Sequence, residues 1–300
     1  MTRSIAVFGL TLLFSALAFA QVNITDANYR VFDSQGGASS LDKIIEAAGK
    51  ADVIFLGERH DDAVGHFIES EIFRRAFEAY GKERPVALSL EMFERDTQIV
   101  VDEYLQGLIT EKKFLDDSRP WGNYKTDYRP LIEFAKANKL TVIAANAPRR
   151  YINMVSRGGR SSLDKLSKDA KRWLAPLPYA EASESYAKKF TALMSGSGEA
   201  SMGIKNILDS QSLWDATMAD SMARYLKKNK KALIVQVNGS FHSESRLGTV
   251  EHLLRYRPET KVLVVTMQYE DDFQHFDKAK DTNIGDFVIL TDAKVPRSKR

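Results

Sequence analysis

The sequence contains no cysteine among its 300 residues. This absence excludes a thiol nucleophile, a cysteine-ligated zinc or iron–sulfur centre, and an acylated cysteine behind a signal peptide. A chain of this length can bury a sizeable core without disulfides, so their absence does not argue against a stable exported protein. Any catalytic or binding site must therefore be built from other side chains.

The sequence also lacks a strong excess of charge of either sign. Its 43 lysine and arginine residues nearly balance its 40 aspartate and glutamate residues, and the charges are spread along the chain. Proteins that bind nucleic acid usually concentrate basic residues on one surface, and here only the short segment 294–300 is locally basic. The composition therefore predicts no nucleic-acid partner.

Long apolar runs are missing except at the start of the chain. Arg3 precedes an apolar stretch from Ile5 to Leu17, and Ala18-Phe19-Ala20 precedes Gln21. A positive start, an apolar core of this length and an A-x-A site are typical of a cleaved signal peptide. A membrane-spanning helix needs roughly 20 apolar residues. We predict export with cleavage after Ala20, so that residues 1–20 are a signal peptide; a retained membrane anchor is the alternative.

Apolar runs of strand length alternate with amphipathic segments in the rest of the chain. The runs occupy residues 53–56, 86–90, 141–145, 232–237 and 261–266, with weaker edge-strand patterns at 29–32 and 287–290. Helical periodicity predicts helices near 40–48, 66–77, 97–113, 131–137 and 250–254. Strands that alternate with helices form βαβ units. The sequence therefore predicts an α/β fold with a mainly parallel central sheet flanked by helices.

Two segments depart from this alternation. Residues 118–130 are predicted to form an aromatic loop that holds Tyr124 and Tyr128. Between residues 151 and 231, helical patterns follow one another without an intervening strand. We interpret 151–231 as a helical insertion near the carboxyl ends of the strands, inside a single domain that spans 21–300. Helices that only cover one face of the sheet are the alternative.

Polar side chains that could take part in catalysis or ligand binding follow four of the predicted strands. They are Glu58 and His60 after the first strand, Glu91 after the second, Asn146 and Arg149 after the third, and Asn238 and His242 after the fourth. The carboxyl ends of parallel strands meet at one edge of a sheet, where ligands collect. Each residue alone could be a turn residue or a helix cap. Their shared position favours one site, while His66 is expected at the edge of the core and His252 and His275 on the surface.

Two chemistries fit this set of residues. Glu58, His60 and His242 are ligand types for zinc or another divalent metal, which would activate a water for hydrolysis. A Glu–His pair could instead act as a general base without metal. The motifs of helical zinc proteases, P-loop NTPases, dinucleotide-binding dehydrogenases and G-x-S-x-G hydrolases are absent from the sequence.

Several separated motifs resemble one known family. They are Gly57-Glu58-Arg59-His60-Asp61, Leu90-Glu91-Met92-Phe93, Trp121 with Tyr124, Tyr128-Arg129-Pro130, Ala144 to Pro148, Trp214-Asp215, and Gly239 with His242. In this order they resemble the ChaN family of haem-binding, iron-uptake-associated proteins, over roughly residues 51–254. That family shares a superfamily with Tiki metalloproteases and erythromycin-esterase-like proteins. The resemblance implies an α/β core with a helical elaboration and a role linked to haem or iron.

The resemblance also implies a location, a ligand and partners. Members are often anchored through a lipidated cysteine, which this chain lacks, so a soluble periplasmic protein is expected. Haem is the predicted cofactor, with Tyr124, Tyr128, His60 and His242 as its candidate contacts. A homodimer and envelope haem-transport components are the predicted partners. The alternative is a hydrolase that uses Glu58, His60, Glu91 and His242, with Arg149 stabilising an oxyanion or carboxylate.

Overall fold

The computed structural model describes residues 23–194 and 201–298, so the predicted signal peptide lies outside the described residues. One seven-stranded sheet has the order β1-β7-β6-β2-β5-β3-β4. Its strands are β1 (Tyr29–Asp33), β2 (Val53–Glu58), β3 (Val86–Glu94), β4 (Thr141–Asn146), β5 (Leu233–Gly239), β6 (Val262–Glu270) and β7 (Phe287–Asp292). β1 is antiparallel to β7, and the other neighbouring pairs are parallel. The predicted α/β class with a mainly parallel sheet is confirmed.

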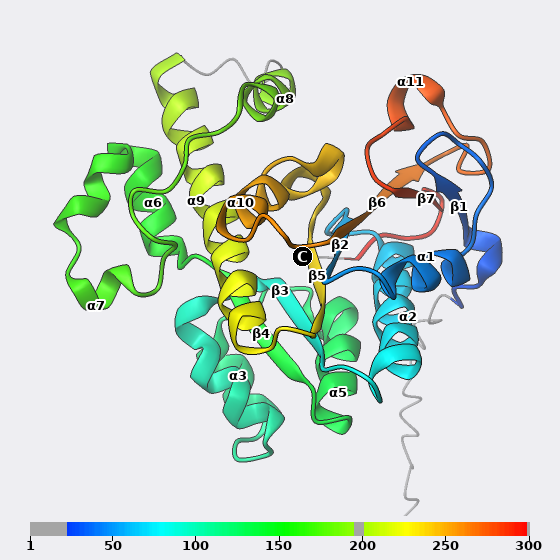
Figure 1. Cartoon of the computed structure of the whole chain (residues 1–300), viewed down its shortest axis with the longest axis horizontal. Coiled ribbons are helices and arrows are strands. Elements are labelled where there is room, and N and C mark those ends of the chain that lie inside the picture. Colours follow the sequence, from blue (N-terminus) through cyan, green and yellow to red (C-terminus); the bar gives the residue numbers. More distant parts are fainter. Residues whose placement is uncertain (1–22, 195–200, 299–300) are drawn as a thin grey trace, which may run out of the picture.

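Helices cover both faces of this sheet (Figure 1). One face is covered by α1 (Leu41–Ala48), α2 (Ala63–Tyr80) and α5 (Arg129–Ala137), and the other by α9 (Ser201–Lys228) and α10 (Thr249–Tyr256). Successive side chains of a strand point to opposite faces. In β2, Ile54 and Leu56 therefore join the first core, whereas Val53 and Phe55 join the second.

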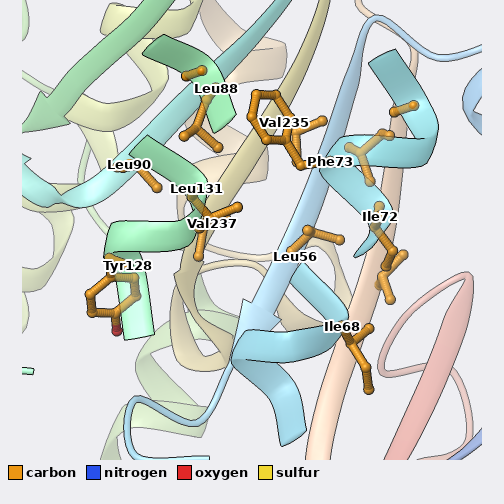
Figure 2. Close-up of a cluster of buried hydrophobic side chains, with 14 of the residues drawn as sticks. Leu56, Ile68, Ile72, Phe73, Leu88, Leu90, Tyr128, Leu131, Val235 and Val237 are labelled. Carbon is orange, nitrogen blue, oxygen red and sulfur yellow. The ribbon is translucent and has the colours of Figure 1, made fainter. Parts of the chain in front are cut away.

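The larger core lies between the sheet and α2 and α5. Figure 2 shows Leu56 of β2 among side chains of neighbouring strands and helices, including Ile68 and Phe73 of α2, Leu131 of α5 and Val235 of β5. Full burial of each such side chain contributes about 1.5–3 kcal/mol relative to exposure. This packing holds the ends of β2 and β5 in fixed positions, and both strands carry predicted site residues.

The insertion comprises α6 (Arg149–Gly158), η4 (Arg160–Lys165), α7 (Lys168–Lys171), α8 (Glu184–Met194) and α9 (Figure 1). Part of it forms a separate core with Tyr151 of α6, Leu163 of η4 and Leu213 of α9, whereas Met218 and Met222 of α9 pack on the sheet. Buried Arg95 ties the insertion to the end of β3, because its guanidinium lies 2.9 Å from the Asp220 carboxylate and donates to the Thr217 carbonyl at 2.7 Å. Among residues 23–194 and 201–298, no helix combines the length and apolar character needed to cross a membrane.

The remaining elements are short and connect the larger ones. They are η1 (Asp26–Asn28), η2 (Arg95–Thr97), α3 (Gln98–Leu105), α4 (Glu111–Ser118), η3 (Tyr124–Tyr128), η5 (Ser240–His242), η6 (Glu244–Arg246) and α11 (Lys278–Asp281). The predicted helix over 97–113 is confirmed in part: α3 and the start of α4 are helical, but Gly107 with φ +75° breaks the segment between them. The predicted loop at 118–130 is also wrong in part, since 124–128 form a π-helical turn that continues into α5.

Candidate functional site

A cavity of about 990 Å³, called the site cavity below, opens at the carboxyl edge of the sheet. The predicted site residues Glu58, His60, Glu91, Arg149 and His242 all line it. They meet there because β5 lies between β2 and β3, and β4 is next to β3. The structure therefore brings together these five residues from four separate strand ends. Asn146 also lines the cavity, whereas Asn238 does not and is buried, with its side chain donating to Ser243.

His60 is held at the cavity by its neighbour two residues earlier. Its Nδ1 lies 2.6 Å from Oε1 of Glu58, which is buried, and its ring packs edge-on against Trp121 with centroids 4.8 Å apart. A carboxylate accepts, so Nδ1 is the donor and Nε2 faces the other way. Gly239 lies next to this nitrogen, since a Cβ there would be 2.7 Å from Nε2. Only glycine leaves room for the ring in this position.

His242 is held in the same manner from the opposite side. Its Nδ1 lies 2.8 Å from Oδ1 of Asp215, a fully buried carboxylate of α9 that also accepts from the hydroxyls of Tyr186 at 2.5 Å and Thr249 at 2.7 Å. Burial opposes a charged imidazole, but the charges of Asp215 and Glu91 outweigh it and raise the pKa of His242 to about 9. His242 is therefore protonated at neutral pH.

Glu91 lies between the two histidines. Its Oε2 accepts from the backbone N–H of Gly239 at 2.7 Å, and its Oε1 lies 3.8 Å from Nε2 of His242. The cavity thus presents one carboxylate between two imidazoles, each fixed at Nδ1 by a second carboxylate. Such pairs orient a histidine and set which ring nitrogen carries the proton. The arrangement can donate a proton, accept one, or bind a cation through nitrogen and oxygen.

A second, buried group of ionisable side chains lies behind Glu58. His66 Nδ1 lies 3.0 Å from Glu58 and 3.2 Å from Glu69, and its Nε2 lies 3.3 Å from Asp127. Burial opposes ionisation of Glu58, but the charge of His66 and the hydrogen bond of His60 hold its pKa below the usual range. Burial and then the charge of Glu58 raise the pKa of Glu69. The expectation that His66 lies at the core edge understates its role, because it contacts three carboxylates.

The other cavity walls are aromatic, aliphatic and cationic. Aromatic and aliphatic walls come from Trp121, Trp214, Phe241, Tyr269, Ile152, Leu193 and Ile207. Arg149, largely exposed, lies over the Trp121 ring at 5.9 Å, and Arg59 lies over the Tyr269 ring at 5.9 Å. Arg297 also stacks on the Tyr269 ring, at 3.5 Å. The mouth of the cavity therefore suits a ligand with a flat apolar body and anionic groups.

The two predicted tyrosines lie outside the cavity lining. Tyr128 is buried in the larger core (Figure 2), and its hydroxyl donates to Oε1 of Glu58 at 2.8 Å, so it supports Glu58 from behind. Tyr124 packs in the core against Phe93 and Phe114, and its hydroxyl has no hydrogen-bond partner within the described part of the chain. Tyr269 is the tyrosine that lines the site cavity.

Sequence reasoning missed Asp215, Tyr269 and Arg59 as site residues. Arg59 could have been identified from its position between Glu58 and His60. Tyr269 could not, because it lies on an extension of β6 beyond the predicted strand 261–266. His252 was expected on the surface, and this expectation is wrong: it is buried between α10 and α9, near Asp215. His275 is exposed as expected.

Comparison with known families gives a match. Residues 44–253, more than two thirds of the chain, match the family described as "Haem-binding uptake, Tiki superfamily, ChaN". The resemblance inferred from the motifs is thereby confirmed. Comparison with curated proteins gives no match.

Solved structures share the fold at low sequence identity. A structure described as "Cofacial heme binding to ChaN of Campylobacter jejuni" is similar with a TM-score of 0.67 and 19% identity, over 89% of this chain and 98% of that one. A succinoglycan biosynthesis protein has a TM-score of 0.51 and 11% identity, over 87% and 92% of the two chains. A Bacillus cereus protein has a TM-score of 0.50 and 11% identity, over 91% of this chain and 96% of that one. These likenesses establish the fold.

Proposed function

The chain belongs to the haem-binding uptake family ChaN of the Tiki superfamily, and on this premise we propose that it binds haem in the site cavity. One observation carries the proposal. The cavity combines an oriented imidazole, His60, with aromatic walls and with two arginines at its mouth. Cofacial haem binding by the structurally similar ChaN of Campylobacter jejuni supports the same ligand class.

The residues of the site cavity fit haem in size and chemistry. Its volume of about 990 Å³ lies at the upper end of the range for small-molecule sites, about 300–1,000 Å³. Trp121, Trp214 and Tyr269 offer flat surfaces for a porphyrin, and Arg59 and Arg149 offer charges for its two carboxylates. Haem, when bound, supplies an iron centre that takes an imidazole or phenolate ligand.

His60 is the iron ligand in this proposal. Its Nδ1–H is held by Glu58, which would leave the lone pair of Nε2 for a metal. His242 is protonated at neutral pH and has no free lone pair, so it donates a hydrogen bond to an anionic group instead. Tyr269 is the second donor available at the cavity wall.

The proposal extends to the biological setting. With the signal peptide predicted from residues 1–20, the mature protein works in the periplasm and carries haem for iron uptake. A homodimer and envelope transport components are its proposed partners. The open mouth of the cavity, walled in part by exposed Leu193, supports transfer of the ligand to another protein.

Titration of the mature protein with haemin tests this function. We expect a saturable shift of the Soret band, which His60→Ala weakens roughly tenfold or more, the equivalent of about 1.4 kcal/mol. Leu108→Ala is the matched surface control, because Leu108 is exposed on another part of the chain and lies outside the cavity. A wild-type protein without a saturable shift, or a His60→Ala protein that binds as tightly, contradicts the proposal.

Hydrolysis is the second candidate, and one observation favours it. Glu91 lies 3.8 Å from Nε2 of a protonated His242, so a general base and a general acid share the cavity. Zinc or another divalent metal held by Glu58, His60 and His242 is the alternative cofactor of this activity, and it would take the place of the proton on Nε2 of His242. A screen with ester and peptide substrates tests it: Glu91→Gln should abolish hydrolysis, and a wild-type protein inactive on every substrate, with and without zinc, contradicts it.

A further inference from the structure

Three buried side chains converge behind the site cavity, between the end of β2 and the first half of α2. They are Glu58, His66 and Glu69, with exposed fractions of 1%, 4% and 0%. One ligand atom from each, the Nδ1 of His66 and one carboxylate oxygen from each glutamate, lies within 4.8 Å of the others. The separations from Nδ1 are 3.0 Å to Oε2 of Glu58 and 3.2 Å to Oε2 of Glu69.

The hydrogen bonds of His66 fix the role of its two nitrogens. Nε2 lies 3.3 Å from the carbonyl oxygen of His60 and 3.3 Å from Oδ2 of Asp127. A carbonyl oxygen only accepts, so Nε2 carries the hydrogen. Histidines that bind metals usually donate their other N–H to a carbonyl or carboxylate in this manner. Nδ1 is the ring nitrogen that faces the two glutamates, and a metal ion bound there would take the place of its proton.

Two oxygen atoms of the group have no hydrogen-bond partner. Oε2 of Glu58 and Oε1 of Glu69 are buried and unsatisfied among residues 23–194 and 201–298, although Oε2 of Glu58 lies close to Nδ1. A buried polar atom without a partner costs about 1–3 kcal/mol, and more when it is charged. A cation held by Nδ1 of His66 and by one oxygen of each glutamate, at about 2.0–2.2 Å from each, would give both buried carboxylates a charged partner.

We propose that Glu58, His66 and Glu69 form a binding site for one divalent transition-metal ion. One imidazole and two carboxylates suit zinc or manganese better than calcium, which prefers oxygen ligands alone. This metal site does not include the Nε2 atoms of His60 and His242 in the site cavity, and it requires no bound haem. Its ion joins β2 to α2 and fixes the carboxylate that orients His60, because Oε1 of Glu58 contacts Nδ1 of His60 at 2.6 Å.

Zinc content gives the first test. The mature protein is stripped with a chelator, incubated with zinc chloride and freed of excess zinc by gel filtration, and its zinc is measured by elemental analysis. We expect the wild-type protein to retain one equivalent more than Glu69→Gln. Glu71→Gln is the matched control, because Glu71 lies on the same helix, pairs with Arg74 and Arg75, and is not part of this group. Equal zinc content in wild type and Glu69→Gln overturns the proposal, as does loss of the same equivalent in Glu71→Gln.

Cobalt gives a test on the unchanged chain, which holds even if Glu69→Gln does not fold. Paramagnetic Co²⁺ shifts the protons of the residues that bind it, and a ligating imidazole contributes one exchangeable N–H signal. The site of Glu58, His66 and Glu69 predicts one such signal, from Nε2–H of His66. Two signals indicate His60 and His242 in the site cavity, and no shifted signal indicates no bound ion; either result overturns the proposal.

Discussion

Nδ1 of His242 lies 2.8 Å from Oδ1 of Asp215, and this buried contact determines the charge of the second imidazole at the site cavity. Burial alone would lower the pKa of His242, so the pKa of about 9 depends on the neighbouring carboxylates, with Asp215 first among them. The pair joins α9 of the insertion to the end of β5. The insertion therefore sets the protonation state of a residue on the sheet.

Asp215→Asn should return His242 to the neutral form at pH 7. Without the carboxylate charge, burial dominates, and the pKa of His242 should fall to or below about 6.5, the value of an unperturbed imidazole. Titration of the imidazole nitrogens by NMR measures this shift. Asp272→Asn is the matched control, since Asp272 pairs with exposed His275 at 2.7 Å and should leave His242 unchanged. A pKa that stays near 9 in Asp215→Asn would assign the charge of His242 to another group.

The same pair should make stability depend on pH. The pKa of His242 is about 9 in the folded state and about 6.5 in the unfolded chain. Its stabilising contribution is thus complete below about pH 6.5 and is lost as the pH rises through about 9, up to roughly 3 kcal/mol. Urea unfolding gives the free energy of unfolding of wild type and His242→Gln at these two pH values. The contribution of His242 is the difference between the two proteins in how steeply this free energy changes with pH. His275→Gln should keep the wild-type slope, and an equally flat profile for wild type and His242→Gln would refute the prediction.

Gly239→Ala should displace His60 without unfolding the protein. The added Cβ would lie 2.7 Å from Cε1 and Nε2 of His60, closer than atoms approach without movement, so the ring must leave its position. Haemin affinity should fall roughly tenfold or more. Gly203→Ala is the control, because a Cβ at Gly203 in α9 meets no described atom within 4 Å and should only favour the helix, by about 0.5–1 kcal/mol. Unchanged affinity in a folded Gly239→Ala protein would remove His60 from the haem site.

The two tyrosines of the η3 turn should respond differently to removal of the hydroxyl. Tyr128→Phe leaves Oε1 of buried Glu58 without one of its donors and should lower the free energy of unfolding by about 1.5–3 kcal/mol. Tyr124→Phe removes a hydroxyl that has no hydrogen-bond partner in the described chain, so the change should stay within about 0.5 kcal/mol. Urea unfolding of both variants measures the difference. Equal losses of unfolding free energy in the two variants would contradict a stabilising hydrogen bond from Tyr128 to Glu58.

The sequence predicted the sheet and most of the site because both depend on local patterns. Apolar runs mark strands wherever both faces of a sheet are covered, as they are here. The carboxyl ends of parallel strands share an edge, so Glu58, His60, Glu91, Arg149 and His242 could be placed together without the strand order. In the structure these residues line one cavity because β2, β5 and β3 are neighbours in the sheet.

The parts that could not be predicted depend on long-range contacts. Asp215 lies on the buried stripe of a long helix, and only the packing of α9 against β4 and α10 brings it to His242. The π-helical turn of η3 has no periodic signal in five residues, so 118–130 resembled a loop. Tyr124 and Tyr128 then seemed available as ligands, although the turn directs both into the core.

The separate core of the insertion has a consequence for how binding preference can change. Ile152 packs in that core, whereas the apolar residues of β2 that precede Glu58 pack in the cores of the sheet. Substitutions along α6 can therefore reshape one wall of the cavity while Asp215 of α9 keeps His242 in place. Related chains could exchange this wall as a unit and acquire different ligands on an unchanged set of strand ends.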